Sequence, residues 1–151
     1  MTNTMQKINI VPTFIYPADE ELVHPLQVEL KKNLTGMGRG ITELLDPPTL
    51  RRHFITRYMV AMHDGYPIGA ATIRIINKSC ELYKLYVSPT VQRNQVGTLL
   101  VAQVMAEMRA LGMEEMKVEA QESSREFWGK MISIHPFDQE VSCFSNIIFR
   151  L

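Results

Sequence analysis

The stretch that decides the fold is residues 81–100, ELYKLYVSPTVQRNQVGTLL. Its first part, residues 82–87, is rich in aromatic and β-branched side chains, which is typical of a β-strand. Pro89 ends this strand, because proline has no N–H to donate to a β-ladder. Apolar residues then recur at helical spacing and predict a helix from Gly97 to Leu111. A strand, a polar loop and a helix N-terminus in this order can bind phosphate groups through main-chain N–H groups and the helix dipole.

The loop in this stretch, QRNQVGT at residues 92–98, resembles the acetyl-CoA pyrophosphate loop of the GNAT family of N-acetyltransferases. The family pattern there is Gln or Arg, two residues, Gly, one residue, and then Gly or Ala. Gln92 and Gly97 match this pattern, whereas Gln95 stands where the first glycine is usual. Glutamine keeps the main-chain N–H but has less conformational freedom than glycine. We therefore expect acetyl-CoA binding that is retained but weaker, with loss of binding as the alternative.

The composition indicates a soluble, intracellular globular protein. The chain has 151 residues, with 16 Lys plus Arg and 16 Asp plus Glu, so its formal net charge is zero. It contains no long basic run of the kind that neutralises nucleic-acid phosphates, so we expect no nucleic-acid partner. The apolar runs are too short to cross a bilayer, and the N-terminal residues lack the apolar core of a signal peptide. We expect one domain over residues 1–151, located in the cytoplasm.

Cysteine and histidine positions predict neither a disulfide framework nor a metal site. The two cysteines, Cys80 and Cys143, match no metal-ligand spacing, and the four histidines are scattered. We expect no metal ion, and we interpret Cys80 as a buried structural thiol.

Periodicity and turn residues predict strands alternating with helices. The expected strands are residues 8–16, 58–63, 68–76, 81–87, 116–120 and 147–151, and the expected helices are 19–34, 46–54, 97–111 and 123–131. The first helix should bury Leu22, Leu26, Val28 and Leu30. Three glycines within residues 35–40 favour a mobile loop on the substrate side over a phosphate-binding loop, because no strand directly precedes them.

This order of elements is that of the GNAT fold, so the resemblance covers nearly the whole chain. It implies an α/β protein of the mixed-sheet (α+β) kind, a central twisted sheet flanked by helices. Its fourth and fifth strands, here residues 81–87 and 116–120, run parallel and splay apart in a V, and the family threads the pantetheine arm of the cofactor into that gap. A helix between two parallel strands is also what a right-handed βαβ connection requires.

The resemblance also implies which residues hold acetyl-CoA. Main-chain groups of residues 85–87 would bind the pantetheine amides, and the N–H of Val87 would face the thioester oxygen. Main-chain N–H groups of the loop would bind the pyrophosphate, and Arg93 would add a charge-assisted contact. The implied cofactor-binding residues are Leu85, Tyr86, Val87, Gln92, Arg93, Asn94, Gln95, Val96, Gly97, Thr98, Gln121 and Trp128.

Glu81 is the candidate general base for the amine. It lies eleven residues before Gln92, the same offset as the catalytic glutamate in histone-acetylating members of the family. A glutamate at this place can accept the amine proton directly or through water. The alternative is a solvated glutamate at the start of a strand.

The proton donor for the departing CoA thiolate stays open. Trp128 stands where the family often has a tyrosine in this role, and Gln121 stands where Asn is common. Tryptophan has no hydroxyl group, so Tyr83, Tyr86, Ser124 or water would have to supply the proton. We expect Trp128 to pack against the cofactor or the core.

These features predict an N-acetyltransferase that moves an acetyl group from acetyl-CoA to a primary amine by direct attack in a ternary complex. The acceptor is a small molecule or a protein amine that the sequence does not identify. Ten methionines suit an adaptable interface and favour a homodimer. The rival hypothesis is a catalytically impaired GNAT-fold module that binds CoA or a protein, which Gln95 and Trp128 favour.

Overall fold

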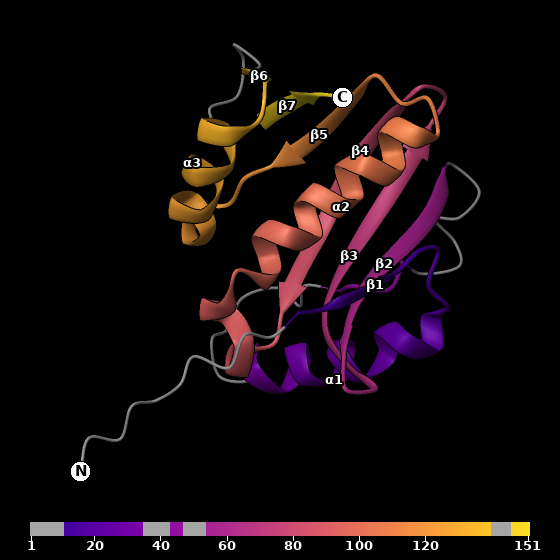
Figure 1. Cartoon of the computed structure of the whole chain (residues 1–151), viewed down its shortest axis with the longest axis vertical. Coiled ribbons are helices and arrows are strands. Elements are labelled where there is room, and N and C mark those ends of the chain that lie inside the picture. Colours follow the sequence, from indigo (N-terminus) through magenta and orange to yellow (C-terminus); the bar gives the residue numbers. More distant parts are fainter. Residues whose placement is uncertain (1–10, 35–42, 47–53, 140–145) are drawn as a thin grey trace.

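A mixed seven-stranded sheet forms the centre of the computed structural model, which describes residues 11–34, 43–46, 54–139 and 146–151 (Figure 1). The strands are β1 (Thr13–Ile15), β2 (Ile55–His63), β3 (Tyr66–Ile76), β4 (Ser79–Val87), β5 (Glu115–Glu119), β6 (Phe137–Gln139) and β7 (Asn146–Arg150). The helices are α1 (Glu20–Leu34), α2 (Val96–Ala110) and α3 (Arg125–Ile134), with short 3₁₀ helices η2 (Pro89–Asn94) and η3 (Glu122–Ser124). The strand order is β1-β2-β3-β4-β5-β7-β6. Of these neighbours, β4 and β5 run parallel and the other pairs run antiparallel.

The predicted hairpin of β2 and β3 is confirmed, and its turn residues explain it. Asp64 and Gly65 connect the two strands, and both have positive φ, 48° and 80°. Two-residue turns with positive φ at both positions match the twist of the strands they join. The turn from β3 to β4 also has two residues, of which Asn77 has positive φ, 55°.

Helices cover both faces of the sheet, with α1 on one face and α2 and α3 on the other (Figure 1). The core under α2 includes buried side chains of that helix together with Met59, Ala71, Ile73, Met116 and Phe149 from the strands. Trp128 and Met131 bring α3 into the same core. The smaller core under α1 joins Val23, Leu26 and Leu30 to Tyr58, Val60 and Ala70. Burial of these apolar side chains is what holds the layers together.

One predicted core position of α1 is wrong. Val28 is 53% exposed, whereas Val23, Leu26 and Leu30 are buried. Val28 lies two residues beyond Leu26, which is about 200° around an α-helix at 3.6 residues per turn, so the two side chains point to opposite sides. The buried stripe has the spacing i, i+3, i+7, and Gln27 completes it.

The parallel strands β4 and β5 splay apart as predicted. Their pairing begins at Ser79 and Glu115 and ends at Leu82 and Val118. Beyond this point β4 carries a β-bulge, because the register with β3 shifts and Tyr83 is the extra residue. The mouth of the V therefore begins at Tyr83 on one arm and at residue 119 on the other.

The other expected elements are confirmed to within a few residues, with two additions. The sequence analysis did not predict β6, and it treated η2 as an irregular turn. The first strand is shorter than expected, since β1 covers residues 13–15 only. Residues 8–10 of that strand, the glycine-rich loop 35–40 and most of the expected helix 46–54 lie outside the described residues.

Candidate active site

A cavity of about 650 Å³ lies where β4 and β5 separate. This volume is typical of a pocket for a small molecule or cofactor. Its walls come from both arms of the V, from the start of α2, and from η3 and α3. The lining residues are Leu82, Tyr83, Lys84, Leu85, Val87, Gln95, Gly97, Thr98, Val118, Glu119, Gln121, Ser123, Ser124, Phe127, Trp128 and Lys130.

The N-terminus of α2 forms one wall of this cavity and can bind an anion. Leu99 donates its main-chain N–H to the carbonyl of Gln95, so the N–H groups of Val96, Gly97 and Thr98 precede the first bond of the helix. The side chain of Gln95 makes no capping hydrogen bond, and the first turn holds no acidic residue. These N–H groups and the positive end of the helix dipole fit a pyrophosphate.

Gln95 adopts the conformation for which the family pattern has glycine. Its φ and ψ are 60° and 18°, in the left-handed region, and its side chain is exposed at the cavity. The main chain therefore follows the expected turn although a side chain is present. The left-handed conformation costs a non-glycine residue about 1–2 kcal/mol.

Gly97 sets how closely α2 approaches α3. A Cβ atom on Gly97 would lie 3.2 Å from Cε2 of Phe127 and 3.6 Å from Cγ2 of Val87. A larger residue would push apart the two helices that flank the cavity. Phe127 in turn packs edge-to-face on Trp128, with ring centroids 4.9 Å apart.

Most of the predicted cofactor residues come together at this cavity. Those that line it are Leu85, Val87, Gln95, Gly97, Thr98, Gln121 and Trp128. Val96 is fully buried in the core, and Tyr86 turns its side chain toward α1. The last three residues of η2 are Gln92, Arg93 and Asn94, and the structure describes their main chain but not their side chains. The donors present at the helix N-terminus and the size of the cavity fit the CoA group that the sequence predicts.

The cavity reaches through the sheet to the face that carries α1. Leu82 belongs to the core under α2, whereas Lys84 is paired with Thr72, whose hydroxyl bonds the carbonyl of Leu44 on the other face. Directly opposed residues of antiparallel strands share a face, so Lys84 lies on the α1 face. Glu119 alternates with the buried Val118 and lies on the α1 face as well. One cavity thus has the N-terminus of α2 on one face and charged side chains on the other.

Glu81 lies on the α1 face but in the closed part of the V. Its ladder partners are Arg74 on β3 and Lys117 on β5, and it is not one of the cavity-lining residues. Its role as a base therefore stays a prediction. The structure adds Glu119, Lys84 and Lys130, which the sequence analysis did not single out. The alternation of Val118 and Glu119 on a short strand was the signal for Glu119.

The hydroxyl groups named as proton donors differ in position. The hydroxyl of Tyr86 donates to Oε1 of Glu29 at 2.9 Å, outside the cavity. Burial and this hydrogen bond raise the pKa of Tyr86 to about 12. Ser124 lines the cavity and donates to the carbonyl of Gln121 at 3.1 Å. Tyr83 lines the cavity too. Tyr83 and Ser124 therefore remain candidates for the proton donor, whereas Tyr86 does not face the cavity.

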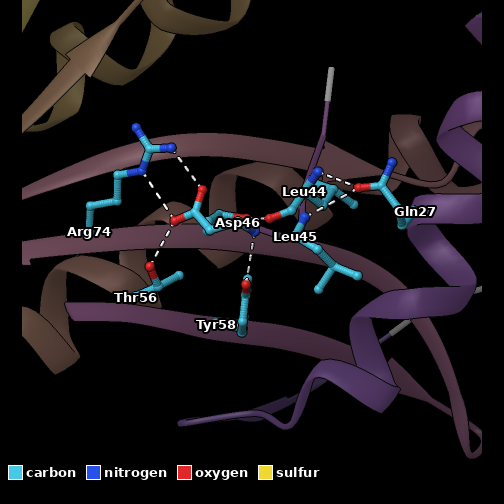
Figure 2. A network of polar contacts seen from close by, with 8 residues as sticks. Gln27, Leu44, Leu45, Asp46, Thr56, Tyr58 and Arg74 are labelled. Carbon is cyan, nitrogen blue, oxygen red and sulfur yellow. Dashed lines mark hydrogen bonds and ion pairs between the residues drawn. The ribbon is translucent and has the colours of Figure 1, made fainter. Parts of the chain in front are cut away.

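A polar network fixes residues 44–46 on the α1 face, as Figure 2 shows. The carboxylate of Asp46 accepts hydrogen bonds from Arg74 at 2.7 and 3.2 Å and from Thr56 at 2.7 Å. Its main-chain N–H donates to the hydroxyl of Tyr58 at 3.1 Å. Burial opposes the charge on Arg74, but its bonds to Asp46 outweigh this effect and raise the pKa of Arg74.

The other half of this network ties the same segment to α1. Oε1 of Gln27 accepts the main-chain N–H groups of Leu44 and Leu45 (Figure 2). Both Gln27 and Asp46 are buried, so these bonds are made away from water, where an unpaired polar group is costly. The segment that precedes β2 is thereby held beside the charged mouth of the cavity.

The described residues contain neither a cluster of metal-ligating side chains nor a membrane-spanning helix. Within them, no group of three or more His, Cys, Asp or Glu side chains is placed to hold a metal ion. No helix in the described part of the chain is long and apolar enough to span a bilayer.

The fold is similar to those of several solved acetyltransferase structures. The chain is similar to the PaiA N-acetyltransferase of Thermoplasma acidophilum, solved with coenzyme A, at 18% identity and a TM-score of 0.64, covering 93% of this chain and 98% of the other. It is similar to an aminoglycoside acetyltransferase from an uncultured soil metagenomic sample, solved with sisomicin, at 18% identity and a TM-score of 0.64, covering 86% and 91%. It is also similar to N-acetylglutamate synthase of Neisseria gonorrhoeae, solved with coenzyme A and N-acetyl-glutamate, at 17% identity and a TM-score of 0.65.

That last match covers 93% of this chain and 35% of the synthase chain, so our chain spans about a third of its length. At these identities the three structures show the fold. No curated protein matches the chain. The model of the acetyltransferase (GNAT) family matches residues 18–131, which include α1, the V and most of α3. The chain therefore belongs to the GNAT acetyltransferase family.

Proposed function

We propose that this protein is an acetyl-CoA-dependent N-acetyltransferase that acts on a primary amine in a ternary complex. The observation that carries the proposal is the cavity between β4 and β5, with a phosphate-binding helix end on one face and charged side chains on the other. This arrangement lets the cofactor and an amine approach the same space from opposite faces of the sheet.

The main chain would hold most of the cofactor. The N–H groups at the start of α2 would bind the pyrophosphate, and the β4 residues past the end of the ladder would bind the pantetheine amides. The N–H of Val87 stays our candidate for the thioester oxygen. CoA supplies the activated acetyl group when bound, and the protein supplies position and electrostatic stabilisation.

Direct attack by the amine is supported by the state of Cys80. Its side chain is buried and does not line the cavity, and its Sγ donates to the carbonyl of Glu115. Burial raises the pKa of this thiol to about 12, so it does not form a thiolate at neutral pH. In the proposed step the amine forms the N–C bond, the C–S bond breaks, and one proton leaves the nitrogen while the sulfur gains one.

Glu81 would take the proton of the amine, through water because it lies outside the cavity lining. The experiment measures thiol release from acetyl-CoA with a panel of amines, and the product by mass. We expect amine-dependent thiol release, and Glu81→Gln should lower kcat about 100-fold or more. Glu114→Gln, an exposed glutamate just before β5, is the matched control. If Glu119→Gln lost turnover while Glu81→Gln kept it, the general base would be Glu119 on β5 and not Glu81.

The acceptor class draws support from the neighbours only at a coarse level. Two of them were solved with sisomicin and with N-acetyl-glutamate, which are small molecules. We therefore favour a small-molecule amine over a protein amine. A single domain over residues 1–151, a cytoplasmic location, a homodimer and the absence of a nucleic-acid partner stay predictions.

A CoA-binding module without turnover is the second candidate function. Trp128, 6% exposed and packed in the core, occupies the place of the family tyrosine and has no hydroxyl group to protonate a thiolate. This candidate predicts acetyl-CoA binding without thiol release from any amine. The same assay, run beside a binding titration, separates it from the enzyme.

A further inference from the structure

Two opposite charges lie on the two arms of the V at the mouth of the cavity. Lys84 belongs to β4 and Glu119 to β5, and both line the cavity. Both lie on the α1 face, because Lys84 pairs with Thr72 and Glu119 alternates with the buried Val118. The phosphate-binding end of α2 lies on the other face, so these two charges face the acceptor side.

The two charges do not neutralise each other. In the described part of the chain, no ion pair joins Lys84 to Glu119. Nζ of Lys84 lies 4.7 Å from the centre of the Tyr83 ring, which places the ammonium group over an aromatic face rather than on a carboxylate. A cation and an anion that line one cavity from opposite arms complement a ligand that carries both charges.

The neighbouring charges on this face are already matched among themselves. Arg74 forms an ion pair with the buried Asp46, and its guanidinium lies over the ring of Tyr83, the bulge residue. Glu81 and Lys117 are ladder partners in the closed part of the V and do not line the cavity. The third charged residue that lines the cavity, Lys130, belongs to α3 on the other face. On the α1 face, the charges that remain for a ligand are therefore those of Lys84 and Glu119.

We infer that the acceptor is an amino acid or a similar amine that also carries a carboxylate. Lys84 binds the carboxylate, and Glu119 binds the ammonium group before it loses its proton. The inference rests on the proposed function and names the substrate class of that site. The group transfer is the one already described: N–C forms, C–S breaks, and one proton leaves nitrogen while one reaches sulfur.

The test compares matched acceptors that differ only at the carboxyl group. Purified full-length protein is assayed with acetyl-CoA and a panel of amino acids, each beside its own carboxamide, and the ratio of their kcat/KM values is recorded. We expect the free acid to be preferred about tenfold or more, the size typical of a hydrogen bond between charged groups. The carboxamide lacks the anion and also has a less basic amine, so each kcat/KM value is divided by the fraction of neutral amine at the assay pH. The corrected ratio then reports the carboxylate.

Substitution of Lys84 then links the preference to this residue. Lys84→Gln should bring the ratio close to one while the affinity for acetyl-CoA stays the same. Lys117→Gln, on the same face but outside the cavity lining, is the control and should keep the ratio. Carboxamides accepted as well as the acids, or a preference that survives in Lys84→Gln, would overturn the inference while leaving the enzyme in place. A folded protein that binds acetyl-CoA and acetylates no amine would overturn the proposed function and this inference with it.

Discussion

The guanidinium carbon of Arg74 lies 3.3 Å from the centre of the Tyr83 ring. Tyr83 is the bulge residue of β4 and lines the cavity, while Arg74 holds Asp46 in the segment that precedes β2. This stack joins the cavity wall to the anchored segment on the α1 face. The shape of the mouth therefore depends on an ion pair that is itself almost completely buried.

Removal of Arg74 should destabilise the fold strongly. The side chains of Arg74 and Asp46 are 13% and 1% exposed, so Arg74→Met leaves a buried carboxylate without its charged partner, bonded by the Thr56 hydroxyl alone among side chains. We expect the free energy of unfolding to fall by about 3–5 kcal/mol, as measured by urea denaturation.

The control for this prediction is an ion pair of the same type at the surface. Arg150 and Asp138 are 64% and 55% exposed, and Arg150→Met should change stability far less, because exposed pairs are screened by solvent. Equal losses in the two variants would contradict the importance of the buried network.

Replacement of Gln95 by glycine should improve the cofactor site. Gln95→Gly removes the cost of a side chain at φ 60° and lets the main chain approach a phosphate closely. We expect tighter acetyl-CoA binding in a calorimetric titration and a melting temperature that does not fall. Gln95→Ala keeps the left-handed residue without the long side chain and serves as the control. Weaker binding in both variants would mean that the Gln95 side chain itself contacts the cofactor.

A single added methyl group at Gly97 should weaken both the fold and the site. Gly97→Ala places Cβ 3.2 Å from Phe127, and such overpacking costs about 1–3 kcal/mol. Gly129→Ala is the matched control, since a Cβ there meets nothing within 4 Å and alanine favours the α3 helix. Thermal unfolding of the two variants should shift in opposite directions. Phe127→Leu should restore part of the loss in Gly97→Ala.

The stability of the protein should fall in mildly acidic solution through His135. Burial, with a smaller effect from the nearby Arg109, lowers the pKa of His135 below its ordinary value of 6.5. Because the pKa is lower in the folded protein, the unfolded chain binds the proton more readily. The contribution of the neutral His135 to the free energy of unfolding is therefore complete above pH 6.5. It is lost as the pH falls through the pKa of His135 in the folded protein. His135→Gln should remove part of this pH dependence in unfolding experiments between pH 7 and 5. An unchanged profile in that variant would assign the dependence to other groups.

The sequence predicts the fold well where local signals are strong. The aromatic and β-branched run of β4 and the apolar spacing of α2 each carry their own pattern, and both elements are confirmed. The parallel V was implied by the resemblance to the GNAT family and is confirmed. By contrast, β6 covers only Phe137–Gln139, which is too short for any periodicity, and it forms because β7 offers it an edge.

The candidate site was predictable only in part, for a physical reason. The loop predicted to bind phosphate is local in sequence, so its pattern could be recognised directly. Lys84 and Glu119 meet at one cavity because a bulge at Tyr83 sets the register and two strands diverge, and neither event has a local signature. Arg74 and Asp46 are 28 residues apart and pair only through tertiary contact.

The central claim is that the cavity between β4 and β5 binds acetyl-CoA, and calorimetric titration of the purified protein tests it most directly. The account predicts micromolar binding of both acetyl-CoA and CoA, weakened in Gly97→Ala and unchanged in Gly129→Ala. Failure of the folded protein to bind either ligand would contradict the account.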